Sequence, residues 1–182
     1  PITYAYVAGR WPLSAYQTVF AREPGSAEMP SAGRPFTHRL VTSLVAAGVG
    51  FAPVVLHTGV SSAEPGEPPY PERFEVPVLT IERIGAAWAA GGRVIAVGTT
   101  AARALESAAT DAGGLAPARG WTDVVLGPDR PARIVDGLIT GWHPAGASHL
   151  RLLEAVAGQD LTAAAYAAAL ATGYLWHEFG DS

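Results

Sequence analysis

The sequence contains no cysteine, no lysine and no asparagine, so its 12 basic residues are all arginine. Without cysteine there is no disulfide, no thiolate zinc site and no cysteine nucleophile, and without lysine no catalytic Schiff base. Charged residues make up 15% of the chain, against about 25% in a typical soluble domain. No apolar run approaches the roughly 20 residues of a membrane-spanning helix. We therefore expect a globular cytoplasmic protein with no membrane contact.

The length of 182 residues fits one domain, because domains average about 150 residues, and it is sufficient to bury a core. Glycine and proline, with 21 and 15 residues, stay below the level that is typical of disorder. The chain begins at Pro1 without a methionine and continues at once into an apolar, aromatic stretch. This beginning predicts a piece of a longer protein, in which residues 1–182 form a single α/β domain.

Helical and strand patterns alternate along the chain. Strands are expected at 17–20, 50–56, 93–97, 122–126 and 133–140. Helices are expected at 37–47, from residue 80 to the glycines at 91–92, from the turn at 98–100 to about residue 112, at 148–157 and at 162–172. The expected N-caps are Thr37, Thr80, Ser148 and Thr162. The alternation predicts a layered α/β sandwich with a mostly parallel or mixed sheet flanked by helices.

The sharpest local feature is the segment 94–106, where an apolar strand ends at Gly98 and a helix begins. Ligands of parallel α/β sheets bind at the carboxyl ends of strands, and the free N–H groups of a helix N-terminus suit a phosphate or carboxylate. The candidate ligand-binding residues here are Gly98, Thr99, Thr100, Arg103 and Glu106. The alternative is an ordinary helix start with Thr100 as the N-cap and a surface pair of Arg103 with Glu106.

A second candidate is the loop at 23–34, which is rich in small residues and precedes a helix. Its backbone can approach a ligand closely, and its candidate residues are Ser31, Gly33 and Arg34, the last as a partner for an anion. The alternative is a connection made of turn residues. The length of the loop favours a function.

Three ionisable residues are candidates for acid–base chemistry. His57 follows a predicted strand, Asp136 stands in an Asp-Gly pair, and His143 lies in a loop before a predicted helix. The alternatives are a turn for the aspartate and ordinary hydrogen-bonded structure for the histidines. The histidines lack metal-ligand spacing, so no metal is expected. The aromatic tail at 174–181 is either a wall for a base or a packed terminus.

Taken together and in chain order, these segments are more specific than any one of them. The segments are Tyr16-Gln17-Thr18-Val19-Phe20-Ala21, Pro24-Gly25-Ser26-Ala27, Pro30-Ser31-Ala32-Gly33 with Phe36-Thr37, His57-Thr58-Gly59-Val60, Arg93-Val94-Ile95-Ala96-Val97-Gly98-Thr99-Thr100 with Arg103 and Leu105-Glu106-Ser107, Val135-Asp136-Gly137-Leu138-Ile139-Thr140, His143-Pro144 and Phe179-Gly180-Asp181. The chain resembles the S-adenosylmethionine:tRNA ribosyltransferase-isomerases of queuosine biosynthesis over nearly its whole length. The resemblance covers the later part of the family's α/β domain. It implies a fragment that lacks the family's N-terminal strands and its inserted β-barrel domain.

The resemblance implies a transferase and isomerase with S-adenosylmethionine and tRNA as substrates, no cofactor and no metal. The ribosyl moiety of S-adenosylmethionine would move to a deazaguanine base in tRNA and rearrange to epoxyqueuosine, with release of adenine and methionine. The chemistry needs a base for an acidic proton beside the sulfonium. The candidates for proton transfer are His57, Asp136 and His143. The candidates for holding the methionine carboxylate or a phosphate are Thr99, Thr100 and Arg103.

Two departures from the family pattern leave an alternative open. The chain has Arg34-Pro35 where the family commonly has a histidine, and the segment 67–74 lacks the histidines that usually precede its acidic and aromatic residues. The alternative is a divergent or inactive homologue that binds a nucleoside or nucleotide without modifying tRNA. The net charge of −4 also favours it, because tRNA binding needs cationic contacts. A third interpretation is an α/β domain whose loops are purely structural.

Overall fold

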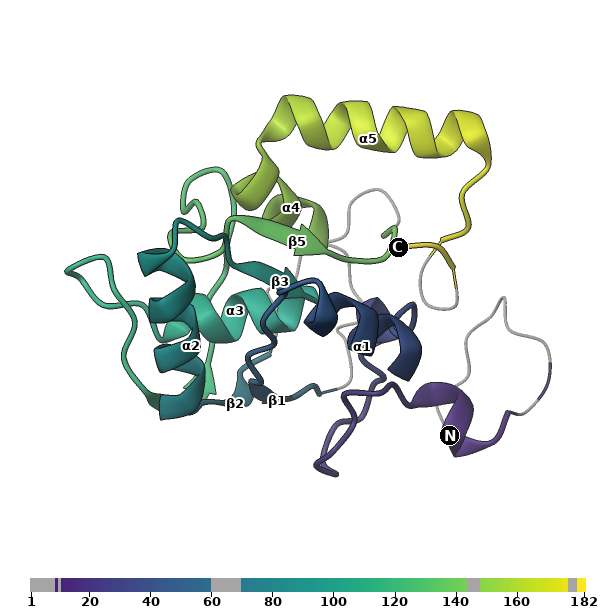
Figure 1. The fold of residues 1–182 in the computed structure, drawn as a ribbon. Coiled ribbons are helices and arrows are strands. Elements are labelled where there is room, and N and C mark those ends of the chain that lie inside the picture. Colours follow the sequence, from purple (N-terminus) through teal and green to yellow (C-terminus); the bar gives the residue numbers. More distant parts are fainter. Residues whose placement is uncertain (1–8, 10, 60–69, 144–147, 177–179) are drawn as a thin grey trace.

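The computed structural model describes residues 9, 11–59, 70–143, 148–176 and 180–182, which form two small sheets with helices around them (Figure 1). The first sheet is antiparallel, with the strand order β1 (Val55–His57), β2 (Glu72–Val76) and β4 (Ala118–Thr122). The second sheet pairs β3 (Ile95–Val97) with β5 (Gly137–Ile139) in parallel. The helical elements are η1 (Leu13–Tyr16), η2 (Ser31–Gly33), α1 (His38–Ala46), α2 (Val78–Ala89), α3 (Thr99–Ser107), α4 (Ser148–Ala157) and α5 (Gln159–Thr172).

The α/β architecture with flanking helices is confirmed. Of the two expected sheet types, the mostly parallel one is wrong, because the described strands form one antiparallel and one parallel sheet. The sequence reading missed β2, which follows a proline-rich segment and contains charged residues. β1 and β2 pair antiparallel, with Val55 opposite Glu75 and His57 opposite Arg73. Only β3 and β5, with α3 between them in the chain, keep the predicted parallel arrangement in the described part of the molecule.

Several predicted strand and helix ends are also corrected. Residues 17–20 contain a turn and no strand, and the strand expected at 122–126 lies earlier, as β4. The helix expected to reach residue 112 ends at Ser107, because Ala109 and Leu115 pair across a turn that contains two glycines. The strand expected at 50–56 forms only at β1.

The predicted helix caps have mixed outcomes. Thr37 is confirmed as the N-cap of α1, because its Oγ1 accepts a hydrogen bond from the Leu40 N–H at 3.1 Å. Thr80 is not a cap: it lies inside α2, is fully buried, and its hydroxyl donates to the Pro53 carbonyl. Thr162 lies inside α5 and donates to the Gly158 carbonyl at 2.8 Å. The side chain of Ser148 lies outside the described part.

The core lies between the sheets and α3. Helix α3 packs against β1, β2, β3 and β4, and its Ala102 and Ala104 are fully buried, which lets the helix approach closely. The main core residues are Phe74, Val76, Ile84, Val94, Ala96, Leu105, Val124, Leu126, Ile134, Val135 and Leu152. In the described ranges no helix combines the length and apolarity that a bilayer crossing requires. Because α3 contacts both sheets, its N-terminus lies where their loops meet.

Candidate functional site

The start of α3 lies at the carboxyl end of β3. Gly98 caps the helix with φ +96°, a backbone conformation that glycine adopts without strain, and its N–H donates to the Ile139 carbonyl at 2.9 Å. Thr99 and Thr100 are the first two helical residues, and Thr99 is buried. The proposed capping by Thr100 is therefore wrong. The first N–H groups of the helix and the two hydroxyl groups lie together at this edge of the sheet.

The loop before α1 also lies against the start of α3. A Cβ atom on Gly98 would lie 3.8 Å from the Cβ of Ala32, so η2 packs directly against the start of α3. Gly33 is buried against the side chains of Thr18 and Phe20, whereas Arg34 is exposed. The structure thus brings η2, which contains Ser31 and Gly33, against the start of α3 through Ala32.

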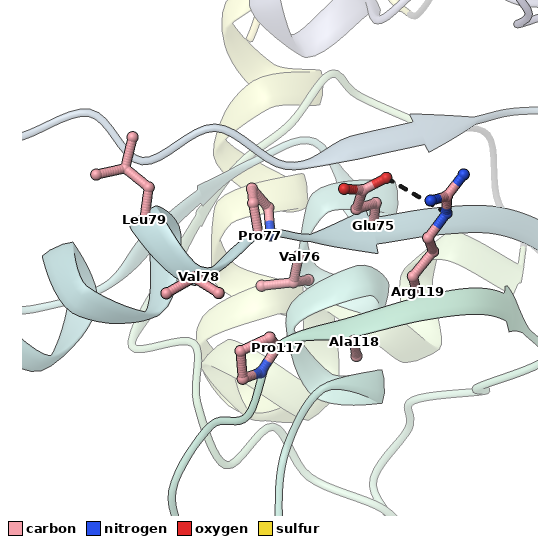
Figure 2. A pocket seen from close by; sticks show the side chains of 8 residues that line it. All are labelled: Glu75, Val76, Pro77, Val78, Leu79, Pro117, Ala118 and Arg119. Carbon is pink, nitrogen blue, oxygen red and sulfur yellow. Dashed lines mark ion pairs between the residues drawn. The ribbon is translucent and has the colours of Figure 1, made fainter.

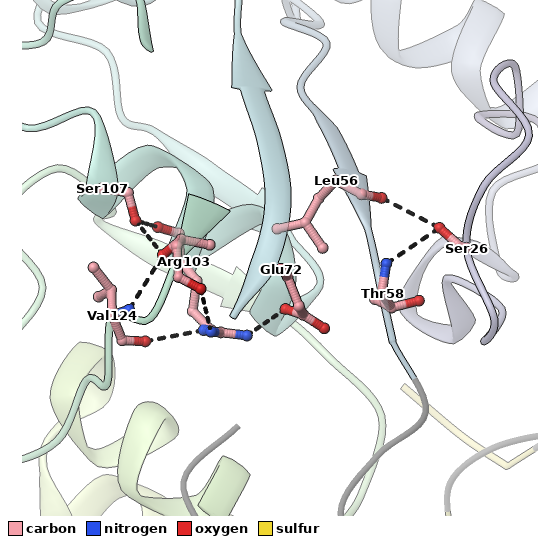
Figure 3. A network of polar contacts seen from close by, with 8 residues as sticks. Ser26, Leu56, Thr58, Glu72, Arg103, Ser107 and Val124 are labelled. Atoms are coloured by element: carbon pink, nitrogen blue, oxygen red, sulfur yellow. Dashed lines mark hydrogen bonds and ion pairs between the residues drawn. The ribbon is translucent and has the colours of Figure 1, made fainter. Parts of the chain in front are cut away.

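Hydrogen bonds hold the earlier part of the loop along the end of β1 (Figure 3). The Ser26 hydroxyl donates to the Leu56 carbonyl and accepts from the Thr58 N–H, both at 3.3 Å. The Ala27 N–H donates to the Thr58 carbonyl at 2.8 Å. The same loop therefore contacts β1 through Ser26 and α3 through Ala32, which places the end of β1 near the start of α3.

His57 lies at this junction, at the end of β1. Its imidazole packs so closely on Gly25, at φ +148°, that no Cβ would fit there. Its Nδ1 atom is buried and has no hydrogen-bond partner within the described ranges. A buried ring nitrogen without a partner is costly in a purely structural histidine, so His57 remains a candidate for the proton transfer.

Arg103 is turned into the protein from the second turn of α3. It is 5% exposed and forms an ion pair with Glu72, while its Nε donates to the Val124 carbonyl at 3.0 Å and a terminal nitrogen to the Thr122 carbonyl at 3.4 Å (Figure 3). The proposed surface pair with Glu106 is therefore wrong. These contacts join α3 to the start of β2 and the end of β4.

Glu72, the first residue of β2, is a site residue that the sequence reading missed. Burial raises the pKa of its carboxyl group, which the Arg103 guanidinium and the Gly59 N–H lower in part and the Glu28 carboxylate raises further. The available signal was the acidic residue before the aromatic Phe74, which the family pattern contains. Glu72 and Arg103 fix the residues after β1 against α3.

Glu106 is a buried carboxylate with a different task. It is 3% exposed, and its Oε1 accepts the N–H groups of Arg133, Ile134 and Val135 at 2.9, 2.8 and 3.1 Å. Three successive backbone donors on one oxygen hold the segment that leads into β5. Glu106 therefore acts on the position of β5.

Asp136 lies at the opposite end of the parallel pair. Its Oδ2 accepts from the Val94 N–H at 2.8 Å, and its own N–H donates to the Val94 carbonyl at 2.9 Å. Asp136 lies beside Val94, four residues before Gly98, which corresponds to about 13 Å along the strand at roughly 3.3 Å per residue. The structure thus does not bring Asp136 together with Thr99 and Thr100.

His143 follows β5 and lies at the carboxyl end shared with Gly98. It is 5% exposed, and its ring stacks on His149 of α4 with centroids 4.1 Å apart and planes at 2°. Its N–H donates to the Tyr166 hydroxyl at 3.2 Å, and Thr140 Oγ1 lies 3.4 Å from its Nε2. Burial raises the pKa of Tyr166, which the His143 N–H lowers in part.

An aromatic cluster lies beside His143. Trp142 contacts Tyr166 and Tyr174 edge to face at 4.9 and 5.6 Å between centroids, and Trp176 lies 6.1 Å from Tyr166. The rings of the predicted tail thus pack on one another, while the buried Trp142 Nε1 lacks a partner in the described part. Among the described residues, no group of three or more histidine, aspartate or glutamate side chains is placed to hold a metal.

The family model described as "Queuosine biosynthesis protein" matches residues 1–182. The chain belongs to the queuosine biosynthesis protein family. It is 41% identical over 97% of its length to the S-adenosylmethionine:tRNA ribosyltransferase-isomerase of Methylobacterium sp., and 41% over 92% to that of Synechococcus elongatus. It covers 52% and 48% of those two proteins, so it spans about half the length of the curated relatives it matches.

A solved structure of this queuosine biosynthesis family has the same fold. The crystal structure of the S-adenosylmethionine tRNA ribosyltransferase of Thermotoga maritima superposes with a TM-score of 0.69 at 33% identity. The likeness covers 83% of this chain and 50% of the other. The resemblance drawn from the sequence segments is thereby confirmed.

Proposed function

We propose that the chain carries part of the active site of an S-adenosylmethionine-dependent ribosyltransferase-isomerase that acts on tRNA. The ribosyl moiety would pass to a deazaguanine base and rearrange to epoxyqueuosine. The supporting observation is the meeting of three segments, the loop with Ser26 and Ala32, the end of β1 and the start of α3. These segments also carry the family resemblance.

The start of α3 suits the methionine carboxylate of S-adenosylmethionine. Its free N–H groups and the positive end of the helix dipole favour a negative group, and the Thr99 and Thr100 hydroxyls are further donors. Ser31 and Gly33 flank Ala32, which borders the same edge, and the guanidinium of the exposed Arg34 is the proposed contact for a phosphate. Arg103 and Glu106 act on this site through the backbone segments that they hold.

His57 and His143 are the proposed groups for the proton transfers. Each lies at the carboxyl end of a strand, and a neutral imidazole can take the acidic proton beside the sulfonium. Asp136 remains a third candidate, although its hydrogen bond to Val94 places it at the opposite sheet end. No step requires a cofactor in this proposal.

The binding step is tested by calorimetry of the chain with S-adenosylmethionine. Thr100→Val should weaken binding by about 10- to 150-fold, the effect of one hydrogen bond to a charged group. The matched control is Thr42→Val on α1, where the hydroxyl donates only to the His38 carbonyl. Absence of binding, or equal affinity in both variants, would overturn the assignment.

The chemical step is tested by adenine release in the presence of tRNA that carries the deazaguanine base. His57→Gln and His143→Gln should keep S-adenosylmethionine binding but lower the rate by about 100-fold or more, as expected for a lost general base. His38→Gln, on the exposed side of α1, is the control. Binding without adenine release in the parent chain would instead support a homologue that only binds a nucleoside.

A further inference from the structure

The outer face of the antiparallel sheet is open along β2 and β4, although its inner face is part of the core. Along β2, Phe74 is buried while Arg73 is exposed and Glu75 is partly exposed. Along β4, Arg119 and Trp121 are exposed, and the Trp121 side chain is 71% exposed. Helix α3 packs on this sheet from the core side. The outer face therefore presents a large aromatic ring and two arginines to solvent.

The strand register orders these side chains in rows. Arg73 stands directly opposite Trp121, and Glu75 directly opposite Arg119. Directly opposite side chains of an antiparallel pair lie on the same face with Cβ atoms about 5 Å apart, and successive rows follow at about 7 Å. The Trp121 indole thus has the Arg73 guanidinium directly opposite on β2, and the Arg119 guanidinium two residues earlier on its own strand.

An open hollow continues this face beyond the second row (Figure 2). Its volume is about 490 Å³, and its rim carries Glu75 and Arg119, whose Oε2 and Nε lie 3.6 Å apart. Its floor is apolar and is formed by residues of the segment 76–79 together with Pro117 and Ala118.

The charges on this face favour nucleic acid over a protein partner. Two arginines face one glutamate, and no ion pair among the described residues involves Arg73. Arginine and tryptophan also occur in protein interfaces, but the centre of such an interface is mostly apolar, whereas here the residue opposite the aromatic ring is an arginine. Arginine forms bidentate contacts with phosphate, and an exposed tryptophan offers a stacking surface for any base.

We propose that the face formed by Arg73, Glu75, Arg119 and Trp121 binds unpaired nucleotides of an RNA loop. Trp121 stacks on a splayed base, and Arg73 and Arg119 contact the adjoining phosphates. The inference deepens the proposed function by giving its tRNA partner a surface. It also accounts for RNA binding by a chain with a net charge of −4, because the contact needs only a local excess of arginine.

The test is fluorescence anisotropy of a labelled RNA hairpin with an unpaired loop, titrated with the 182-residue chain. Trp121→Ala should weaken binding by about 5- to 100-fold, the range for loss of one stacked base, while Trp121→Phe should recover most of it. Arg73→Gln should lower the slope of log affinity against log salt by about 0.7. A fully paired duplex of equal phosphate count should bind more weakly than the hairpin.

The matched controls are Trp11→Ala and Arg39→Gln, which remove an exposed indole and an exposed guanidinium away from this sheet. Both should bind the hairpin as the parent chain does. Equal affinity of the parent chain and Trp121→Ala, at unchanged circular dichroism, would overturn the proposal. So would equal losses in Trp121→Ala and Trp11→Ala.

Further outcomes distinguish this proposal from the proposed function and from a dimer interface. RNA binding that depends on Trp121, without S-adenosylmethionine binding, keeps the surface and rejects the proposed function. S-adenosylmethionine binding without RNA binding rejects the RNA surface and leaves the S-adenosylmethionine site of the proposed function standing. A dimer in sedimentation that Trp121→Ala dissociates would show that a second copy covers this face, which would also overturn the RNA assignment.

Discussion

Glu106 offers the sharpest test of whether a buried carboxylate of the site is structural or contacts the ligand. Its Oε1 accepts three backbone N–H groups, from Arg133, Ile134 and Val135, at 2.8–3.1 Å. Glu106→Leu keeps the approximate volume and removes the acceptor from all three donors. Glu106→Gln keeps an acceptor oxygen in place but removes the charge.

The expected magnitude follows from the burial of the three donors. A buried N–H that loses its partner costs about 1–3 kcal/mol. Two of these hydrogen bonds are buried and the one to Arg133 is partly buried, so Glu106→Leu should lower the free energy of unfolding by about 3–6 kcal/mol. Glu106→Gln should lower it by about 1–3 kcal/mol, because neutral hydrogen bonds are weaker than charge-assisted ones.

The assay is urea unfolding followed by far-ultraviolet circular dichroism and linear extrapolation. Glu82→Leu, at an exposed position of α2, is the control and should change the free energy by less than about 0.5 kcal/mol. A loss below about 1 kcal/mol in Glu106→Leu would refute the reasoning. Unchanged stability of Glu106→Gln with lost S-adenosylmethionine affinity would assign the carboxylate to the ligand.

Three more outcomes follow from the same region. Arg103→Met should lower the free energy of unfolding by about 3–5 kcal/mol because it leaves Glu72 buried without its cation, and Arg103→Met with Glu72→Leu should lose less, measured as a double-mutant cycle. Because the pKa of Glu72 is raised in the folded state, its protonated form favours folding; this contribution to stability is complete below pH 4.5 and is lost as the pH rises through the raised pKa. The difference in unfolding free energy between the parent chain and Glu72→Gln should therefore change with pH over this range. A difference that does not change with pH would contradict this. Gly25→Ala should cost about 1–3 kcal/mol at φ +148° against the His57 ring, whereas Gly120→Ala, which meets open space, should not destabilise; equal thermal shifts would contradict this.

Local signals predicted the α3 region well. A short β-branched run, a glycine and two threonines define β3, the turn and the start of α3, and these depend on backbone preferences of a few adjacent residues. Thr37 as the N-cap of α1 is equally local. The loop with Ser31 was a further candidate, and the structure places its Ala32 against Gly98, whereas its part in a binding site stays a prediction.

Long-range pairing was not predictable from periodicity. Strand β2 has charged residues at Glu72, Arg73 and Glu75, so its pattern reads as a polar loop until β1 and β4 supply hydrogen-bond partners. The roles of Arg103 and Glu106 likewise depend on partners 20 to 30 residues away, such as Val124 and Ile134. A carboxylate or guanidinium is identified as ligand-binding or structural only when those partners are known.

The exposed row on β4 also bears on solubility. In the sheet formed by the described residues β4 is an outer strand, and outer strands invite pairing with strands of other molecules. A solvent-facing tryptophan increases that hazard, and charged residues nearby oppose it. Arg119 stands two residues before Trp121, so its charge opposes β-aggregation at this edge. Its ion pair with Glu75 is long, at 3.6 Å, and exposed. Arg119→Val should therefore shorten the time to aggregation on heating even where it leaves the folded structure intact.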